Sequence, residues 1–398
     1  MRIAVIGAGA AGLAAAGSAK GAEVTVFDHS DKVGKKIYIT GKGRCNFTNV
    51  CDSETFLSNV VNNAMFLRGA IARFSPNDAL NLMNQNGCKT KVERGRRAFP
   101  QSDKASDVTK ALVKYAERNG AAIRLYSDIK DVTPNNDGFT VRYIGGSDDF
   151  DKVIVCTGGL SYPSTGSDGS FWEIIKKLGH SMIQPKPSLV ALETREDLSG
   201  AEGLSLKNVT LNCGKHSLFG ELLITDNGIS GPIALTLSAF MSREKYPYDI
   251  NIDFKPAMTD DELDSRLIKD FGNNLNRQFK NALDFFLPKS IIPYIIERSG
   301  ISPNKQVNSV TKEERKRLAH TVKHFVLTVT GNAGFDRAVV TSGGVDVRQV
   351  NPKTMESKLV RGLYFGGEVL DVDALTGGYN FHIALATGYT AGAAAVNS

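Results

Sequence analysis

Three glycines and one aspartate near the start of the chain have the types and spacing of a nucleotide-binding turn. Gly7, Gly9 and Gly12 follow one apolar run, and Asp28 ends a second. In a βαβ unit the first glycine permits the tight turn, the second lets backbone N–H groups approach a pyrophosphate, and the third lets the helix pack against the strand. Asp28 stands where a carboxylate accepts hydrogen bonds from ribose hydroxyls and repels a 2′-phosphate. The pattern therefore predicts a site for FAD or NAD rather than NADP.

The segments that follow this turn predict helices and then a group of short strands. Residues 64–86 and 103–119 have the spacing of amphipathic helices. Short β-type runs separated by turn clusters then predict a β-meander that returns to an apolar strand. The runs lie at residues 123–126, 139–144 and 153–156. The last one leads into Thr157 and Gly158, where the backbone can again come close to a ligand.

The middle of the chain has a different character and is interpreted as an inserted domain. Residues 184–188 (QPKPS) predict a linker. Four β-like segments follow, at residues 189–194, 209–213, 217–225 and 248–254. Beyond them, Thr259 with Glu262 and Thr311 with Glu314 fit the capping box that begins a helix. Gly-rich loops, short strands and a final Ala/Gly-rich helix from about residue 380 complete the chain.

Composition limits the compartment and the partners. The chain has 398 residues, a net charge of +6 and five cysteines. The cysteines include no CxxC pair, which favours a reduced, cytoplasmic protein without structural zinc. No stretch of about twenty residues has the hydropathy of a membrane span. We therefore expect a protein that is neither exported nor embedded in a membrane.

Two basic clusters are the features that could bind an anion. They are Lys89, Lys91, Arg94, Arg96 and Arg97, and Lys312, Arg315, Lys316 and Arg317. Because 42 acidic residues are interspersed with the basic ones along the chain, we interpret both clusters as solvated faces. The charge gives little support for nucleic acid as a partner.

Four further segments resemble one known family. They are residues 34–49 (GKKIYITGKGRCNFTN), 158–166 (GGLSYPSTG), 222–232 (LLITDNGISGP), and 362–371 with 377–380 (GLYFGGEVLD and GGYN). In this order they are similar to the bacterial FAD-dependent oxidoreductase family that includes aminoacetone oxidase and a bile-acid-pathway flavin reductase. The resemblance covers nearly the whole chain.

The resemblance implies an α/β fold with an interrupted cofactor domain. A Rossmann-like, glutathione-reductase-type FAD domain would be made of residues 1–187 and 336–398. A β-rich subdomain and a small helical one would occupy residues 188–335. A second GxGxxG is absent from the sequence, so any NAD(P)H would bind transiently at the flavin rather than in a domain of its own.

The resemblance also implies which residues contact FAD. The glycine-rich turn would approach the pyrophosphate, Asp28 the ribose and Glu368 the ribitol chain. The last helix would begin beside the flavin, where its N-terminus stabilises negative charge on the reduced ring. The implied contacts are Gly7, Gly9, Ala10, Ala11, Gly12, Asp28, Lys36, Gly43, Arg44, Cys45, Asn46, Thr48, Thr157, Gly158, Gly367, Glu368, Gly378, Tyr379 and Asn380.

The sequence identifies no catalytic residue, but three side chains are candidates. Cys45 could react as a thiol or simply pack, since it has no resolving partner. His382 could act as an acid or base or pack at a helix start. Tyr162 could donate a hydrogen bond to the substrate or fill a lid. The remaining histidines show no metal-ligand spacing, so no metal site is expected.

These observations favour an FAD-dependent oxidoreductase that acts on a small organic substrate at flavin N5. An amine oxidase would pass electrons to O2, whereas a reductase would take them from NAD(P)H and reduce an activated C=C bond. From a different class, the chain could be a flavin-containing RNA-modification or redox-sensing protein, an alternative that rests on the basic clusters.

Overall fold

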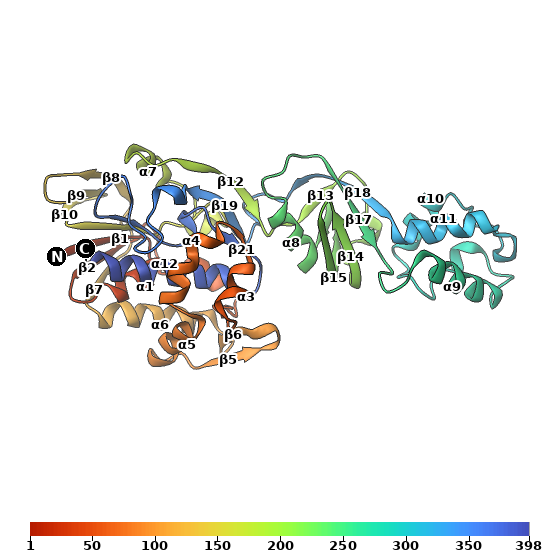
Figure 1. Ribbon diagram of the computed structural model, residues 1–398, viewed down its shortest axis with the longest axis horizontal. Helices are drawn as coiled ribbons and strands as arrows, with labels where there is room; N and C mark the ends of the chain where they lie inside the picture. Colours follow the sequence, from red (N-terminus) through yellow and green to blue (C-terminus); the bar gives the residue numbers. More distant parts are fainter. Residues whose placement is uncertain (398) are drawn as a thin grey trace. The chain divides into compact units, whose positions relative to one another are not determined.

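The computed structural model describes residues 1–397, and its contacts divide the chain into two compact units (Figure 1). The first unit contains Met1–Ser188 together with the chain from Gly334 onward, and the second is Leu189–Ala333. Among the described residues, no helix is both long enough and apolar enough to cross a bilayer.

A five-stranded parallel sheet forms the centre of the first unit. Its order is β20 (Leu363–Phe365), β11 (Lys152–Val155), β1 (Arg2–Ile6), β2 (Glu23–Phe27) and β7 (Ala121–Arg124). β11 and β20 are buried at every residue, and β1 and β2 at all but the first. Strands of a parallel sheet are covered on both faces and therefore have continuous apolar sequences. This is why the strands could be predicted from their apolar runs.

Along the chain, the β-meander lies between β7 and β11 of this sheet and forms a separate sheet of its own. It consists of β8 (Ile129–Pro134), β9 (Phe139–Tyr143) and β10 (Gly146–Phe150). The run predicted at 123–126 belongs to the parallel sheet instead, as β7, and the apolar strand to which the meander was predicted to return is β11 of the same sheet. Residues from Gly146 onward pair with β9 and form the third strand of the meander.

Helices and short sheets surround the parallel sheet. The helices of the first unit are α1 (Ala10–Ser18), α2 (Lys35–Ile39), α3 (Ser53–Ser58), α4 (Ala64–Arg73), α5 (Pro76–Gln85), α6 (Ala105–Arg118), α7 (Trp172–Lys177) and α12 (Tyr379–Ala395). Its remaining strands are β3 (Thr48–Asn49), β5 (Thr90–Glu93) and β6 (Arg97–Pro100) in one sheet, β4 (Val60–Asn62) with β21 (Asp373–Ala374), and β12 (Met182–Ser188) with β19 (Val340–Val345).

The single helix predicted over 64–86 is two helices. α4 ends at Arg73 and α5 begins at Pro76. Ser75 caps α5 in a reciprocal capping box with Asp78, and proline is favoured at the first helical position. The helical periodicity on both sides of residues 74–76 concealed this break.

The predicted linker at 184–188 is also wrong in detail, since these residues belong to strand β12. β12 pairs antiparallel with β19, and the register shifts between Ile183 and Lys186, where Pro185 lies. A β-bulge accommodates a proline that cannot donate to a regular ladder.

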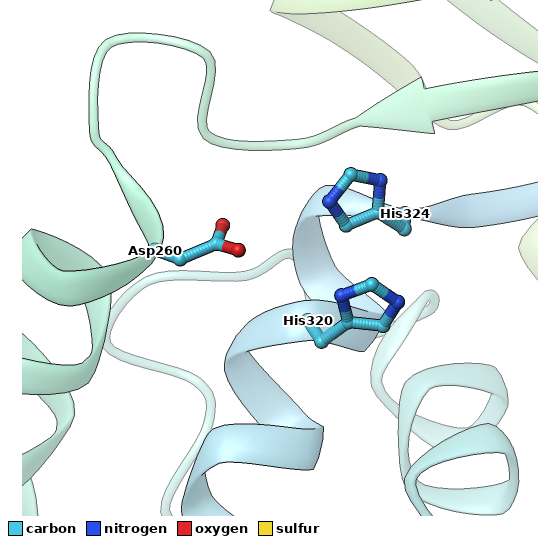
Figure 2. A group of neighbouring side chains, drawn as sticks. All are labelled: Asp260, His320 and His324. Carbon is cyan, nitrogen blue, oxygen red and sulfur yellow. The ribbon is translucent and has the colours of Figure 1, made fainter.

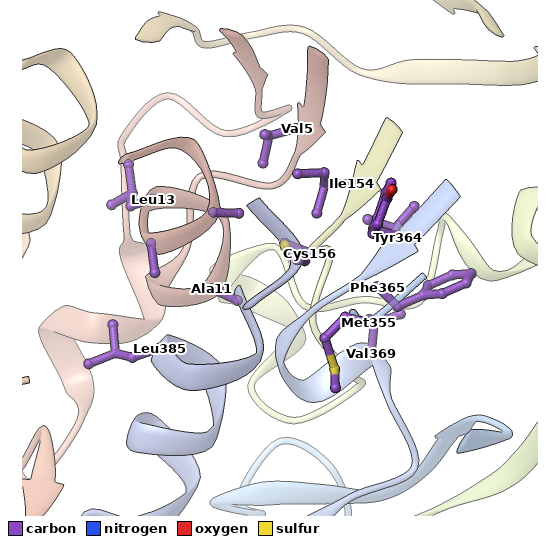
Figure 3. Close-up of a cluster of buried hydrophobic side chains, with 14 of the residues drawn as sticks. Val5, Ala11, Leu13, Ile154, Cys156, Met355, Tyr364, Phe365, Val369 and Leu385 are labelled. Atoms are coloured by element: carbon purple, nitrogen blue, oxygen red, sulfur yellow. The ribbon is translucent and has the colours of Figure 1, made fainter. Parts of the chain in front are cut away.

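Close packing of α1 against α12 fixes the end of the chain beside its beginning. A Cβ on Gly388 would lie 2.1 Å from the Ala11 carbonyl oxygen, and one on Gly392 would lie 2.1 Å from that of Ala15. Side chains of the sheet and of both helices share one apolar core (Figure 3). The two chain ends therefore form one structural unit.

The second unit combines a closed β-barrel with helices. The barrel order is β13 (Leu192–Thr194), β16 (Gly228–Ser230), β15 (His216–Thr225), β14 (Ser205–Cys213), β17 (Tyr248–Asp253) and β18 (Phe325–Asn332). The helices are α8 (Pro232–Phe240), α9 (Asp260–Gly272), α10 (Ile292–Ser299) and α11 (Lys312–Lys323). The capping boxes predicted at Thr259 and Thr311 are confirmed at the starts of α9 and α11.

Candidate functional site

A cavity in the first unit lies where four parallel strands end. Gly7 follows β1, Asp28 follows β2, Cys156 follows β11 and Gly367 lies just beyond β20, and all four line the cavity. Its empty space is about 1490 Å³, part of it open solvent. The carboxyl edge of an open parallel sheet is where such folds bind dinucleotides, so the cavity lies where this fold would place one.

The three glycines of the first turn have three different environments. Gly7 has φ +104°, and a Cβ there would lie 2.4 Å from the Cys156 carbonyl oxygen. A Cβ on Gly12 would lie 1.8 Å from the Gly7 carbonyl oxygen, so only glycine lets α1 approach the turn. Gly9 lines the cavity, and a Cβ there would meet no protein atom within 4 Å. The free approach at Gly9 is what a bound pyrophosphate requires.

Asp28 holds the glycine-rich turn in shape. Its Oδ2 accepts a hydrogen bond from the Ala8 N–H at 2.7 Å, and its Oδ1 accepts one from the Ser30 N–H at 2.8 Å. Each carboxylate oxygen can accept more than one hydrogen bond. Asp28 can therefore support the turn and still receive a hydroxyl hydrogen bond from a ligand in the cavity.

Two helix N-termini contribute residues to the cavity. Ala10 and Ala11 of α1 and Asn380 and Phe381 of α12 line it, and neither helix has a side-chain cap. The first-turn N–H groups of a helix lack intrahelical partners and carry partial positive charge. Both ends thus favour anionic groups of a ligand, such as phosphates. The Asn380 side chain itself is engaged, since it accepts from and donates to the backbone of Ala374.

A partly buried ionic network lies at the wall of the cavity. Lys36 Nζ lies 2.6 Å from Glu368 Oε2 and also donates to the Ser161 hydroxyl. Glu368 Oε1 accepts from Ser161 Oγ at 2.6 Å and from the Thr341 N–H at 2.9 Å. Burial opposes the charged form of Glu368, but the attraction of Lys36 and the hydrogen bonds outweigh it and keep the pKa of Glu368 below its usual value. The network places a fixed cation and a fixed anion beside the ligand.

Unpartnered polar atoms mark the same wall. Thr157 Oγ1 and Ser167 Oγ are buried and have no hydrogen-bond partner within residues 1–397, and both residues line the cavity. Buried polar groups are nearly always paired, so such atoms indicate a missing partner. Together with the open approach at Gly9, they fit a bound dinucleotide that carries hydrogen-bonding groups.

The structure brings eleven of the predicted cofactor contacts to this cavity. They are Gly7, Gly9, Ala10, Ala11, Asp28, Lys36, Thr157, Gly158, Gly367, Glu368 and Asn380. The others, which do not line it, are Gly12, Gly43, Arg44, Cys45, Asn46, Thr48, Gly378 and Tyr379.

Several of these other residues have different partners. Arg44 pairs with Glu93 at 2.5 Å and with Asp103 at 2.7 Å. Gly378 precedes α12 at φ +98°, and a Cβ there would lie 2.6 Å from the Thr48 backbone.

Of the three candidate catalytic side chains, Cys45 and Tyr162 do not line the cavity. Cys45 is fully buried, and burial raises the pKa of its thiol well above the ordinary value. A reactive cysteine needs a thiolate, so this environment is that of a packing residue. Tyr162 follows Ser161 of the ionic network, and its backbone has φ +51°. It therefore lies next to the cavity wall and remains a candidate.

His382 is enclosed by the core. Its Nδ1 lies 3.0 Å from Thr48 Oγ1 and its Nε2 lies 3.0 Å from the Phe74 carbonyl oxygen. Burial lowers the pKa of His382 to about 4, so the ring is neutral near pH 7. With both nitrogens engaged and no place in the cavity, His382 serves packing.

Acidification should destabilise the protein through His382. Because its folded pKa is lowered from 6.5 to about 4, the unfolded chain binds more protons between these values. The free energy of unfolding should fall by about 2 kcal/mol by pH 5 on this account. Urea titrations read by the fluorescence of Trp172, the single tryptophan, would measure it at pH 7.5 and pH 5. His382→Gln should lose this part of the pH dependence, whereas a matched change at the exposed His29 should keep it.

A second prediction concerns Asp28. Asp28→Ala removes the acceptor of two backbone N–H groups, so flavin affinity should fall by about tenfold or more. The flavin-to-protein ratio after purification and a fluorescence titration would measure this. Asp128 also lines the cavity but pairs with Lys130, so Asp128→Ala is the matched control and should retain flavin. Equal flavin content in both variants would contradict the role of Asp28.

Sequence reasoning did not single out Ser167, which lines the cavity, or Ser161 and Thr341, which donate hydrogen bonds to Glu368 of the cavity wall. Ser161 lies within the segment 158–166 that carries the family resemblance, so a signal existed there. The pairing of β12 with β19 positions Thr341, and no local sequence pattern predicted that pairing. Ser167 was not recognisable because its burial against Gly158 is a tertiary contact.

A basic hairpin lies close to the start of α12. Arg94 and Arg96 lie between β5 and β6, and Arg97 is the first residue of β6. All three side chains are exposed, and within residues 1–397 none of them forms an ion pair. The Asn49 side chain donates to both the Gly95 and the Gly377 carbonyl oxygens, at 3.0 and 3.2 Å. The Asn49 side chain therefore bridges the hairpin tip and the turn that leads into α12.

Comparison with known proteins identifies relatives over the whole length. The family described as HI0933-like protein Rossmann domain matches residues 1–394. The chain is 34% identical to a ribosomal RNA dihydrouridine synthase of Haemophilus influenzae, over 97% of this chain and 96% of that protein. It is 33% identical to a 3-dehydro-bile acid delta(4,6)-reductase of Clostridium scindens, over 99% and 98%. A ribosomal RNA dihydrouridine synthase of Escherichia coli is 32% identical, over 95% and 93%.

Solved structures share the fold at low identity. A 3-ketosteroid-delta4-(5alpha)-dehydrogenase of Rhodococcus jostii superimposes with a TM-score of 0.54 at 15% identity, covering 100% of this chain and 96% of that one. This likeness confirms the predicted α/β, Rossmann-like fold with β-rich insertions.

Proposed function

Because the chain belongs to the HI0933-like family of FAD-dependent Rossmann oxidoreductases, we propose that it reduces the C5=C6 bond of a uridine in ribosomal RNA. The relatives are FAD-dependent reductases, so the chain is an enzyme of the oxidoreductase class. The observation that carries the proposal is the full-length similarity to two ribosomal RNA dihydrouridine synthases.

One type of chemistry joins the relatives. Dihydrouridine arises when a C=C bond conjugated with a carbonyl gains two electrons and two protons. The name 3-dehydro-bile acid delta(4,6)-reductase also describes reduction of C=C bonds in a molecule that carries an oxo group. These activities favour the reductase branch of the sequence-based expectation over the amine-oxidase branch. NAD(P)H is the proposed electron donor, and it would supply one hydride for each bond reduced.

The cavity residues fit the cofactor that this chemistry needs. We assign Gly9, Ala10 and Ala11 to the pyrophosphate, Asp28 to the ribose, and Lys36 with Glu368 to the polar chain that leads to the ring. Bound FAD would supply hydride transfer, which no amino acid side chain provides. The N-terminus of α12 favours negative charge at its end of the cavity. Tyr162 is our candidate for donating a proton or hydrogen bond to the substrate.

The basic hairpin supports RNA rather than a small molecule as the substrate. In place of a solvated face, we assign Arg94, Arg96 and Arg97 to contacts with RNA phosphates. Arginines without carboxylate partners can neutralise phosphates and so release counterions from a nucleic acid, whereas the charge of a paired arginine is already neutralised by its carboxylate. A uridine must leave its stack to reach a cofactor, and phosphate contacts beside the cavity would hold the strand while it does so.

A second candidate substrate is a bile-acid-like or steroid-like enone. The 33% identity to the Clostridium scindens reductase favours it, since this value is close to that of the RNA-directed relatives. The two candidates require the same reduction and differ in the molecule that reaches the cavity.

The deciding experiment presents both substrates to one preparation. The flavin-loaded protein would be reduced anaerobically with NADPH or NADH and then mixed with ribosomal RNA lacking dihydrouridine, or with a 3-oxo-Δ4 steroid. Absorbance would follow flavin reoxidation, and mass spectrometry of RNA digests would detect the two added hydrogens.

Reoxidation by the RNA together with dihydrouridine formation is the expected result. Turnover of the steroid alone would replace the proposal with the enone reductase. The flavin could instead be reduced by an amine but by neither pyridine nucleotide, and be reoxidised rapidly by O2. That result would replace the proposed reductase with an amine oxidase.

A further inference from the structure

Three potential metal ligands converge in the second unit. Asp260 is the first residue of α9, His320 lies in the last turn of α11, and His324 directly follows that helix (Figure 2). One ligand atom from each residue lies within 4.8 Å of the other two. All three side chains are exposed. The residues are 60 or more positions apart between the two helices, so folding alone brings Asp260 to the histidines.

Rigid contacts hold the two helices that carry these ligands. Arg315 of α11 binds Asp264 of α9 through two hydrogen bonds, of 2.6 and 3.2 Å. Lys323 donates to Asp253 at 2.8 Å and to the Met258 carbonyl oxygen at 2.6 Å, which fixes the end of α11 against the segment before α9. The ligand backbones are therefore positioned before any ion binds, which is a requirement for a selective site.

The three side chains have no other partners. Within residues 1–397 no hydrogen bond or ion pair is made by the Asp260 carboxylate or by either imidazole. The two rings lie side by side, with centroids 4.3 Å apart and planes inclined at 30°. Their nitrogen lone pairs are thus free, and the C-terminal end of α11 favours a positive charge beside them.

We propose that Asp260, His320 and His324 bind a divalent transition-metal ion of the Zn²⁺ type. Two imidazoles and one carboxylate are a common protein ligand set for zinc, with a fourth position left to water or to another molecule. Bonds of about 2.0–2.1 Å in a tetrahedron place ligand atoms about 3.3 Å apart. The exposed side chains need only rotamer changes to close from 4.8 Å to that spacing. The ion would join the start of α9 to the end of α11.

This inference revises the sequence-based expectation of no metal site. That expectation overlooked the spacing of His320 and His324, which are four residues apart, as are the paired histidines on one helix face in helical zinc motifs. The sequence does not show a third ligand for these two histidines, because Asp260 comes close to them only through the packing of α9 on α11.

The test uses the full-length, flavin-containing protein with its affinity tag removed and trace metals extracted by a chelator. Calorimetric titration with ZnCl2 would give stoichiometry and affinity, and CoCl2 would report coordination through its visible absorbance. The variants are His320→Ala/His324→Ala and Asp260→Asn. His216→Ala removes a histidine elsewhere in the same unit and is the matched control.

We expect one Zn²⁺ per chain in the wild-type protein and in the His216→Ala control. The double histidine variant should bind about 100-fold more weakly or not at all, and Asp260→Asn about tenfold more weakly. Zinc should also raise the thermal midpoint of the wild-type protein by a few degrees and leave that of the double variant unchanged. No saturable binding, or equal affinity in the wild-type protein and the double variant, would overturn the proposal. Equal midpoints without metal would show that the variants are folded.

Discussion

The Gly9→Val protein should fold like the wild type and fail to retain flavin. The backbone at Gly9 has φ −85°, which valine adopts without strain, and a Cβ there meets no protein atom within 4 Å. The new side chain would instead occupy the approach to α1 that we assign to the pyrophosphate. We expect the FAD dissociation constant to rise by about 100-fold or more, equal to about 2.8 kcal/mol. Flavin content after purification and titration of the apoprotein with FAD would measure this.

Two other glycine variants separate binding from folding. Gly272→Val changes an exposed glycine in α9 whose Cβ also meets nothing, so both stability and flavin content should stay at wild-type values. Gly12→Val should lower stability as well as flavin content, because its Cβ would overlap the Gly7 carbonyl oxygen. Wild-type flavin affinity in Gly9→Val would show that the cofactor does not pass this turn.

Removal of the three hairpin arginines should reduce activity on RNA far more than flavin binding. In Arg94→Ala/Arg96→Ala/Arg97→Ala, kcat/KM for an rRNA fragment should fall by about 10- to 100-fold. The slope of log affinity against log salt should become shallower by about 2, since about three phosphate contacts are lost. Reduction of the flavin by NAD(P)H should remain unchanged, because the hairpin does not line the cavity.

The control removes the same charge from paired residues. Lys130, Arg142 and Lys176 lie in the same unit, and each has a carboxylate partner within 3 Å. The triple alanine variant of these residues should keep both the RNA activity and the salt dependence. Equal losses in the two triple variants would mean that total charge matters and that the hairpin is no docking site. An unchanged rate in the arginine variant would remove the structural support for RNA while leaving enone reduction intact.

Much of the fold could be predicted because its signals are local. The glycine turn, Asp28 and the capping boxes each depend on residues a few positions apart or on one βαβ unit. Errors arose where a local signal was ambiguous: helical periodicity continued across Ser75 and Pro76, and a proline-rich strand resembled a linker.

The candidate site could be predicted only in part, for the same reason. Its glycine and aspartate components lie in one motif, and the family resemblance implied Lys36 and Glu368 as cofactor contacts. The ion pair between these two residues was not predicted, because they are 332 positions apart and meet only through the fold. Arg44 was a predicted cofactor contact because of its motif, but in the structure it pairs with Glu93 and Asp103. Whether a charged side chain is paired depends on which segments fold beside it.

The sequence by itself determined the nucleotide-binding turn and the family, because the turn's glycines act through their own backbone and the family is defined by motif order along the chain. Only the tertiary structure decided that His382 is a neutral packing residue and that Asp260 reaches two histidines. It also decided that the arginines of the Arg94–Arg97 hairpin form no ion pair within the described residues 1–397. Burial and charge pairing are properties of the space around a side chain. Segments far apart in the chain fill that space, so no local pattern encodes it.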